Sequence, residues 1–117
     1  MMRRTTASYH AQRPSRTFQT ILEVVRAIPT ACTASYADIA ELAIGSRRAA
    51  RTVGWALASC PTDVPWWRVV RATGELPGVS DRAQTRLLRA EGVVVRRRQP
   101  GESERPVFFI AKDRRWH

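Results

Sequence analysis

Two short segments of helical periodicity are separated by only about three residues, centred on Gly45 and Ser46. The first segment opens at Ser35, where Asp38 lies three residues on and forms a short capping box, and Gly45 is a natural C-terminal cap. Ser46 is expected to cap the next helix at once, over residues 47–58. Two short helices joined by a tight, glycine-containing turn predict a helix-turn-helix.

The rest of the chain predicts elements that flank this pair. We expect a helix over 18–28 ended by Pro29, a strand over 67–71, a loop over 73–78, a helix over 81–91 capped by Ser80 and ended by Gly92, a short strand over 93–95, an exposed loop over 96–106 and a pairing strand over 107–110. The expected core-facing residues of the four helices are Phe18, Ile21, Leu22, Val25, Ile28, Ile39, Leu42, Ala43, Ala49, Ala50, Val53, Leu57, Leu87 and Leu88. This order predicts a mainly α fold with a small β wing, a winged helix-turn-helix DNA-binding domain over residues 17–95.

Charge is concentrated at the two ends. The chain carries 20 basic and 10 acidic residues, a formal charge of +10. We expect residues 1–16 to form a disordered basic N-terminal tail and residues 96–117 to form a basic C-terminal extension. Such a balance argues against a typical small-metabolite enzyme and favours a polyanionic partner, most commonly nucleic acid. The alternative is that the arginines only keep the protein soluble.

The sequence argues against a membrane-spanning protein and against a metal-binding or cofactor-binding protein. No apolar run approaches the roughly 18 residues of a membrane span, so no membrane partner is expected. The two cysteines have no metal-ligand spacing, so no metal or other cofactor is expected. Free thiols fit a reducing cytoplasm, with association to the nucleoid if the cell is prokaryotic.

The third helix is expected to present a basic face. Small residues form its packing side, whereas Arg47, Arg48, Arg51, Thr52 and Trp55 cover the other side. Arginines that are not balanced by an acid on the same helix favour contact with DNA. An ordinary solvated basic face is the alternative.

Catalytic groups are scarce. The only histidines, His10 and His117, lie in the two tails, and Cys60 has no histidine near it in sequence, so its side chain should remain a thiol. Trp66 and Trp67 would point to opposite faces of a strand, one into the core and one towards a surface or pocket. A tryptophan beside arginines can stack on a flipped base, although both rings could equally fill the core. The pattern favours binding over catalysis.

Three motifs in order resemble the C-terminal DNA-binding domain of O6-alkylguanine-DNA alkyltransferases, over about residues 18–92. They are residues 35–40 (SYADIA), 46–54 (SRRAARTVG) and 65–70 (PWWRVV). In active members the third motif is Pro-Cys-His-Arg-Val, in which the cysteine takes the alkyl group and the histidine helps to deprotonate it. Trp66 stands in the cysteine position and Trp67 in the histidine position. The chain therefore resembles the alkyltransferase-like proteins, whose usual motif is Pro-Trp-His-Arg-Val, and departs from them at Trp67.

The resemblance implies roles for individual residues in DNA binding. Tyr36 matches the tyrosine that presses on the phosphate of the target nucleotide, and Arg51 matches the arginine that enters from the minor groove and fills the space of the flipped base. Arg47, Arg48, Thr52 and Trp55 complete the expected DNA contact surface.

A lesion pocket is implied in the same way. Trp66 would contact the flipped O6-alkylguanine, and we expect the pocket to be lined by Tyr36, Pro65, Trp66, Leu76, Pro77 and Gly78. Arg68 is expected to be a partly buried partner of a carboxylate. Glu91 matches the glutamate that supports the family histidine, and is read as a structural remnant.

The function implied by the resemblance is a non-enzymatic, monomeric DNA damage sensor. It would bind O6-alkylguanine in double-stranded DNA through the minor groove, flip the base, and mark the lesion for nucleotide excision repair proteins. Alkyl transfer by the family mechanism has no chemical means without thiol and imidazole. Two alternatives stay open: an alkyltransferase that uses Cys60 or Cys32, and a winged-helix regulator or DNA-coating protein without lesion preference.

Overall fold

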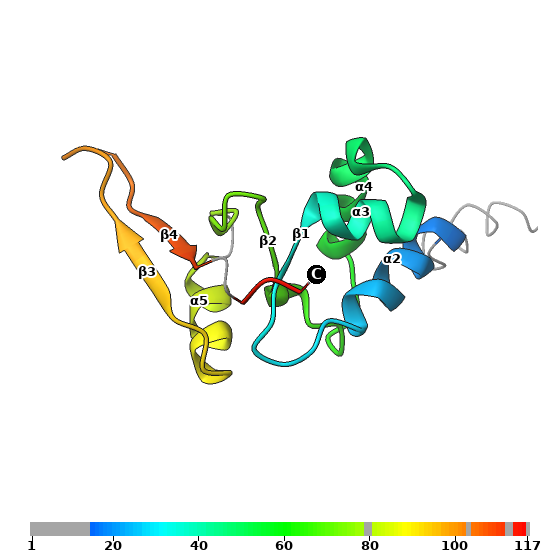
Figure 1. The fold of residues 1–117 in the computed structure, drawn as a ribbon, viewed down its shortest axis with the longest axis horizontal. Coiled ribbons are helices and arrows are strands. Elements are labelled where there is room, and N and C mark those ends of the chain that lie inside the picture. Colours follow the sequence, from blue (N-terminus) through cyan, green and yellow to red (C-terminus); the bar gives the residue numbers. More distant parts are fainter. Residues whose placement is uncertain (1–14, 79–80, 103, 112–113, 117) are drawn as a thin grey trace, which may run out of the picture.

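The structure is a computed structural model, and it describes residues 15–78, 81–102, 104–111 and 114–116. Along the chain lie α2 (Arg16–Arg26), β1 (Ala34–Ser35), α3 (Tyr36–Ile44), η1 (Arg47–Ala49), α4 (Ala50–Ala58), η2 (Trp66–Arg68), β2 (Val69–Val70), α5 (Asp81–Ala90), β3 (Val95–Arg98) and β4 (Val107–Ile110). Helices α2, α3 and α4 gather at one end, and α5 with the β3–β4 hairpin forms the other (Figure 1). The predicted winged helix-turn-helix architecture is confirmed.

The first helix begins earlier than its apolar pattern predicted. Ser15 is its N-cap and accepts a hydrogen bond from the backbone amide of Phe18, so the helix includes Arg16, which we had placed in the tail. The rest of the expected tail, residues 1–14, lies outside the described residues. The expected end at Ile28 was also wrong, because the helix ends at Arg26 with Ala27 as its C-cap. Ile28 is nevertheless buried, as its apolar character required.

The helix-turn-helix forms with one unexpected break. The capping box of Ser35 and Asp38 is present, and Gly45 ends α3 in the left-handed conformation at φ 85°. Ser46 makes no side-chain capping bond, and a 3-10 turn over Arg47–Ala49 precedes α4. The single helix expected over 47–58 is therefore wrong in its first turn. Leu42, expected in the core, is 54% exposed.

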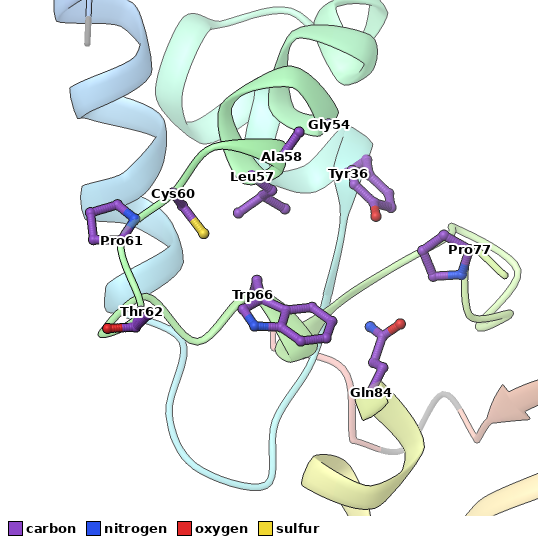
Figure 2. Close-up of a pocket in the computed structure, with 10 residues that line it drawn as sticks. All are labelled: Tyr36, Gly54, Leu57, Ala58, Cys60, Pro61, Thr62, Trp66, Pro77 and Gln84. Atoms are coloured by element: carbon purple, nitrogen blue, oxygen red, sulfur yellow. The ribbon is translucent and has the colours of Figure 1, made fainter. Parts of the chain in front are cut away.

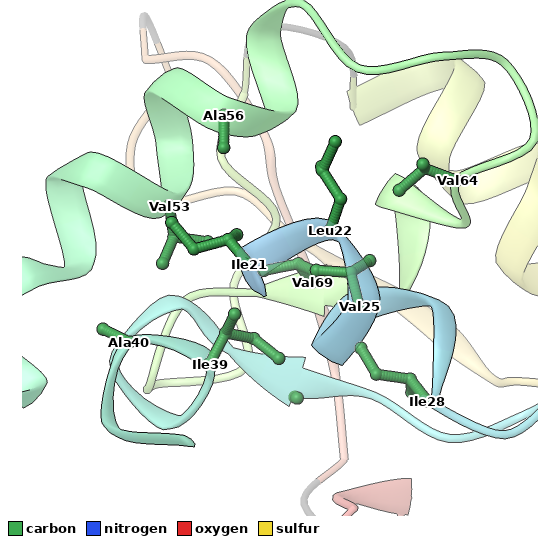
Figure 3. Packing of buried hydrophobic residues seen from close by; sticks show 11 residues of the cluster. Ile21, Leu22, Val25, Ile28, Ile39, Ala40, Val53, Ala56, Val64 and Val69 are labelled. Atoms are coloured by element: carbon green, nitrogen blue, oxygen red, sulfur yellow. The ribbon is translucent and has the colours of Figure 1, made fainter. Parts of the chain in front are cut away.

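The first hydrophobic cluster joins the three N-terminal helices. Ile21, Leu22 and Val25 of α2 lie between the apolar faces of α3 and α4 and the buried Val64 and Val69 (Figure 3). Burying such aliphatic side chains contributes about 1.5–3 kcal/mol each, which makes this cluster the main support of the helix-turn-helix.

The tryptophan motif does not form the strand that we expected over 67–71. Trp66–Arg68 is a 3-10 turn, and only Val69–Val70 is strand, pairing in parallel with β1 so that Ala34 lies opposite Val69 and Ser35 opposite Val70. The reason lies in Pro65, which is the N-cap of this turn and fixes φ at −77°, so that the chain bends before it extends.

The wing is a hairpin, and its first strand continues into the segment over 96–106 that the sequence predicts to be a loop. β3 and β4 pair antiparallel from Val95 with Ile110 to Arg98 with Val107, so the strand expected over 93–95 starts later and continues to Arg98. The boundary that we expect between the DNA-binding domain and the C-terminal extension, after residue 95, therefore falls within β3. The expected strand over 107–110 is confirmed. Ser80, the expected cap of α5, lies outside the described residues, and α5 ends at Ala90 rather than Glu91.

A second hydrophobic cluster supports the wing. It consists of Val70, Leu76, Leu88, Val93, Val95 and Ile110. Gln84 of α5, 2% exposed, donates hydrogen bonds to the carbonyls of Trp67 and Val69 and so ties α5 to the segment between the two clusters.

The C-terminal residues return to the first cluster, where the Trp116 amide donates to the Thr33 carbonyl and Arg115 pairs with Asp38. No helix among the described residues is long and apolar enough to cross a membrane.

One ion pair connects the two ends of the fold. Arg68 Nη2 lies 2.6 Å from Glu91 Oε2, with side chains 14% and 12% exposed, so the predicted carboxylate partner of Arg68 is found. Glu91 also accepts hydrogen bonds from the Ala31 amide and from Trp67 Nε1. Burial alone would raise the pKa of Glu91, but the hydrogen bonds from Arg68, Ala31 and Trp67 outweigh it, and the pKa lies below its ordinary value.

We expect Glu91→Gln to destabilise the protein by about 2–4 kcal/mol, because it leaves the Arg68 guanidinium largely buried without its counter-charge. Glu41→Gln is the matched control, since that carboxylate is 59% exposed and its loss should cost under about 1 kcal/mol. The measurement is the free energy of unfolding, obtained from urea titrations at a series of pH values. A depressed pKa in the folded state gives stability that is present above the ordinary glutamate pKa and lost as pH falls through the folded-state value. The wild type and Glu91→Gln should therefore converge in acid, and a constant difference would contradict the assignment.

Candidate nucleic-acid interface

Helix α4 has three faces that follow from its 100° rotation per residue. Val53 and Ala56 are buried in the first cluster. Arg51 and Trp55, one turn apart, lie on the solvent side, and Trp55 is 60% exposed. Gly54 and Ala58 lie beside that exposed face and line a cavity. The basic face of α4 is therefore directly next to the cavity.

The cavity has a volume of about 530 Å³, within the roughly 300–1,000 Å³ of small-ligand sites. The side chains around it come from five parts of the fold, and Figure 2 shows how they surround the cavity. They are Tyr36 of α3, Gly54, Leu57 and Ala58 of α4, Cys60, Pro61, Thr62 and Trp66 of the following segment and η2, Pro77 of the loop, and Gln84 of α5. Its walls are thus mainly apolar and aromatic.

Backbone pairing brings the two aromatic walls together. Because Ser35 lies opposite Val70, Tyr36 begins α3 beside the end of the segment that carries Trp66. Burial raises the pKa of Tyr36, although Arg71 opposes the shift, so its hydroxyl keeps its proton at neutral pH and can donate a hydrogen bond. Trp66 stands edge-on to Trp67, with ring centroids 6.0 Å apart and planes at 86°.

Only some of the residues expected in the pocket line the cavity. Tyr36, Trp66 and Pro77 line the cavity. Leu76, expected in the same wall, is 5% exposed and packs in the second cluster, because the loop turns its side chain towards α5 and the hairpin. Pro65 is buried as the N-cap of η2, and Gly78 is half-buried; neither lies in the cavity wall that the described residues form.

The expected DNA-contacting residues lie on η1 and α4. Arg48, Arg51 and Trp55 are exposed, and Thr52 is half-buried. Arg47 is exposed but engaged, since its Nη1 lies 2.9 Å from Asp38 Oδ1 and 3.0 Å from Glu41 Oε1. A phosphate would have to compete with two carboxylates for Arg47, whereas Arg48 and Arg51 have no such partners among the described residues.

The second tryptophan, Trp67, contributes a group that can only donate a hydrogen bond. Trp67 Nε1 lies 2.8 Å from Glu91 Oε2, and Arg68 lies over the Trp67 ring at 5.5 Å from its centroid. An indole has a donor but no acceptor, so it can satisfy Glu91 yet cannot accept a proton from a nucleophile. Glu91, read from the sequence as a structural remnant, is the acceptor for three groups.

Cys60 is one of seven cavity-lining residues that are absent from the expected pocket; the others are Gly54, Leu57, Ala58, Pro61, Thr62 and Gln84. The turn after α4 places Cys60 in the cavity wall, with its sulfur directed towards the interior (Figure 2). No local pattern signals this, because it depends on how residues 59–65 close the cavity. Burial raises the pKa of the Cys60 thiol, and Asp63 adds to the effect.

Comparisons with known proteins define the family. The model of the DNA-binding domain of 6-O-methylguanine DNA methyltransferases matches residues 16–93. The chain belongs to this family, and the resemblance drawn from its three motifs is confirmed.

Relatives and solved structures agree with that assignment. Proteins named DNA base-flipping protein from Escherichia coli (strain K12) and Shigella flexneri are each 43% identical over 81 residues, which cover 66% of this chain. The chain spans 62% of the length of these curated relatives. S. pombe Atl1, solved with damaged DNA containing O6-carboxymethylguanine, matches with a TM-score of 0.77 and 23% identity over 91% of this chain and 99% of that one, a likeness of fold. Mycobacterium tuberculosis O6-methylguanine methyltransferase matches with a TM-score of 0.59 and 35% identity over 68% of this chain and 50% of that one.

The environment of Cys60 predicts a poorly reactive thiol. In a Cys32→Ala background, the rate of alkylation by iodoacetamide should reach half its maximum at a pH above that of a free cysteine, about 8.5, because burial disfavours the thiolate. The same variant unfolded in urea is the control, and its alkylation rate should reach half its maximum at the pH of a free cysteine. A midpoint below that of the unfolded chain would show an activated thiolate and revive a nucleophilic role for Cys60.

Proposed function

We propose that this protein binds O6-alkylguanine in double-stranded DNA, holds the flipped base in the cavity, and does not transfer the alkyl group. The observation that carries the proposal is the position of Trp66, which lines a cavity directly beside the exposed Arg51 and Trp55 face of α4. In this family that position belongs to the alkyl-accepting cysteine. An aromatic ring there can stack on a base but offers no nucleophile.

The physical chemistry of base flipping fits this arrangement. Extruding a base costs a few kcal/mol, and less when the base is damaged and weakly paired. Arg51 filling the vacated space and Tyr36 donating to the phosphate would offset that cost. Approach through the minor groove makes shape and deformability more important than base identity, so little sequence preference is expected. The names of the base-flipping relatives and the damaged DNA in the Atl1 crystal support this function.

The chemistry of the cavity supports binding without reaction. Tyr36 and Cys60 both have raised pKa values, so neither presents a ready anion at neutral pH. Trp67 cannot act as a base, and the two histidines, His10 and His117, lie outside the described residues. A site without nucleophile or base retains the lesion, and a retained lesion can be passed to another repair system. That this system is nucleotide excision repair, with the protein acting as a monomer, is a proposal that rests on the family resemblance.

Trp66→Ala should remove most of the preference for damaged DNA, because it deletes the stacking surface, worth about 1–3 kcal/mol per base. The measurement is fluorescence anisotropy with two duplexes that differ only by one O6-methylguanine. Trp55→Ala is the matched control: it removes an exposed tryptophan outside the cavity and should weaken both duplexes alike. Equal affinity of the wild-type protein for the two duplexes would favour a winged-helix regulator instead, and a mass increase of the protein by one methyl group would favour an enzyme.

Arg51→Ala should weaken binding to both duplexes, and weaken the damaged one more, because only the flipped state needs the space to be filled. Arg16→Ala removes the same charge from the first turn of α2 and serves as the control. Its effect should be confined to the general electrostatic contribution and disappear at high salt. If Arg51→Ala behaves like Arg16→Ala at all salt concentrations, α4 does not enter the duplex.

A further inference from the structure

A second large cavity lies at the other end of the molecule, between α5 and the hairpin. It has a volume of about 740 Å³, and five arginines line it: Arg82, Arg86 and Arg89 from α5, Arg97 from β3 and Arg105 from the segment before β4. Phe108 of β4, which lies opposite Arg97 in the hairpin register, lines it as well. We refer to it below as the arginine groove.

The arginine groove and the lesion cavity use opposite faces of α5. Gln84 faces the lesion cavity and is fixed there by its hydrogen bonds to the Trp67 and Val69 carbonyls. At 100° per residue, Arg82, Arg86 and Arg89 lie about 140–160° around the helix from Gln84. Figure 1 shows α5 between the hairpin on one side and β2 on the other. A duplex held at α4 and the lesion cavity would therefore leave the arginine groove open.

Four of these arginines, Arg82, Arg86, Arg89 and Arg97, have no carboxylate partner among the described residues. No carboxylate is among the described residues that line it. Arg82 and Arg86 are exposed and form no ion pair within the described part of the chain, while Arg89 Nη2 bonds the Val95 carbonyl at 2.9 Å and Arg97 Nη2 bonds Gln99 Oε1 at 3.4 Å. Several guanidinium groups gathered in one groove favour an anionic ligand, because each can bind a carboxylate or phosphate with two hydrogen bonds.

The base of the groove decides between the two kinds of anion. Pro106 and Phe108, which are half-buried, add apolar surface to the lining of the groove. Thr85, 6% exposed, also lines the groove, and its hydroxyl has no hydrogen-bond partner among the described residues. An intact duplex presents charged phosphates along its whole backbone, and its stacked bases offer no free face to Phe108. An acidic peptide can place carboxylates on the arginines and an apolar side chain on Phe108, the arrangement of an apolar interface centre with a charged rim.

We propose that the arginine groove is a docking site for an extended acidic segment of a partner protein, anchored by an apolar side chain over Phe108. The site is separate from the lesion cavity and does not depend on lesion binding. Because the two sites occupy opposite faces of α5, one molecule can hold DNA and the acidic segment together. Simultaneous binding would let a protein that retains a lesion bring a partner to it, a consequence that rests on the proposed function.

The test uses a fluorescein-labelled peptide of glutamates with a central phenylalanine and leucine, titrated with the full chain in the absence of DNA. The wild-type protein should bind it in a salt-sensitive manner. Arg86→Glu and Arg97→Glu should each weaken binding by about tenfold or more, since each loses a charge-assisted contact and gains a repulsion. The matched control is Arg96→Glu, which is exposed on the neighbouring position of β3 and therefore points to the opposite side of the hairpin. It makes the same change in net charge and should weaken binding by no more than about twofold.

Four outcomes would overturn the proposal. The first is failure of the peptide to bind the wild-type protein. The second is an equal loss in Arg96→Glu, which would show attraction to net charge alone. The third is undiminished binding when serines replace the two apolar residues of the peptide, which would remove the role of Phe108. The fourth is a greater loss of undamaged duplex binding in Arg86→Glu and Arg97→Glu than in Arg96→Glu, which would make the groove a DNA surface. Thermal unfolding of each variant checks that the fold is retained. Because the peptide titration contains no DNA, its result is independent of whether the lesion proposal holds.

Discussion

The pairing of Arg68 with Glu91 determines how the two ends of this protein meet. Arg68 also donates to the Ile28 carbonyl at 2.8 Å, and Glu91 holds the amide of Ala31, a non-glycine residue at φ 69°. A left-handed alanine costs about 1–2 kcal/mol, so the loop between α2 and β1 adopts this path only because the carboxylate holds it there. The same two side chains fix the turn that carries Trp66 and thereby set one wall of the cavity that Tyr36 and Trp66 line.

Trp67 supplies the remaining hydrogen-bond donor of this arrangement. Without a donor at position 67, Glu91 would lose one of its partners in a site that water hardly reaches. The indole N–H supplies that donor, and its ring also accepts the Arg68 guanidinium over its face. Trp67 therefore has a structural role in this network and no role as a base, because an indole cannot take up a proton.

Local signals in the sequence predicted the helices and the turn between α3 and α4, because caps, periodicity and Gly45 act within a few residues. The predictions failed where distant parts of the chain decide the outcome. Trp66 and Trp67 have the composition of a strand, but Pro65 and the Glu91 network turn them into a 3-10 helix. Leu76 was expected in the pocket wall and belongs to the second cluster, whereas Cys60 was not among the expected pocket residues and lines the cavity. Arg97 is part of the arginine groove only because β4 pairs beside it.

Helix α5 connects the two cavities, because residues on its two faces line them. One face carries Gln84, whose two hydrogen bonds hold the tryptophan turn from behind, and the opposite face carries the arginines of the groove. A helix with the cavity of Tyr36 and Trp66 on one side and a charged groove on the other has room for two ligands that do not overlap. Coupling between the two sites would need an element with two alternative arrangements. Any shift of α5 would have to break the buried hydrogen bonds of Gln84 and the ion pair of Glu91, which directly follows the helix. These bonds favour a scaffold that brings two ligands together over a switch in which one ligand changes the affinity for the other.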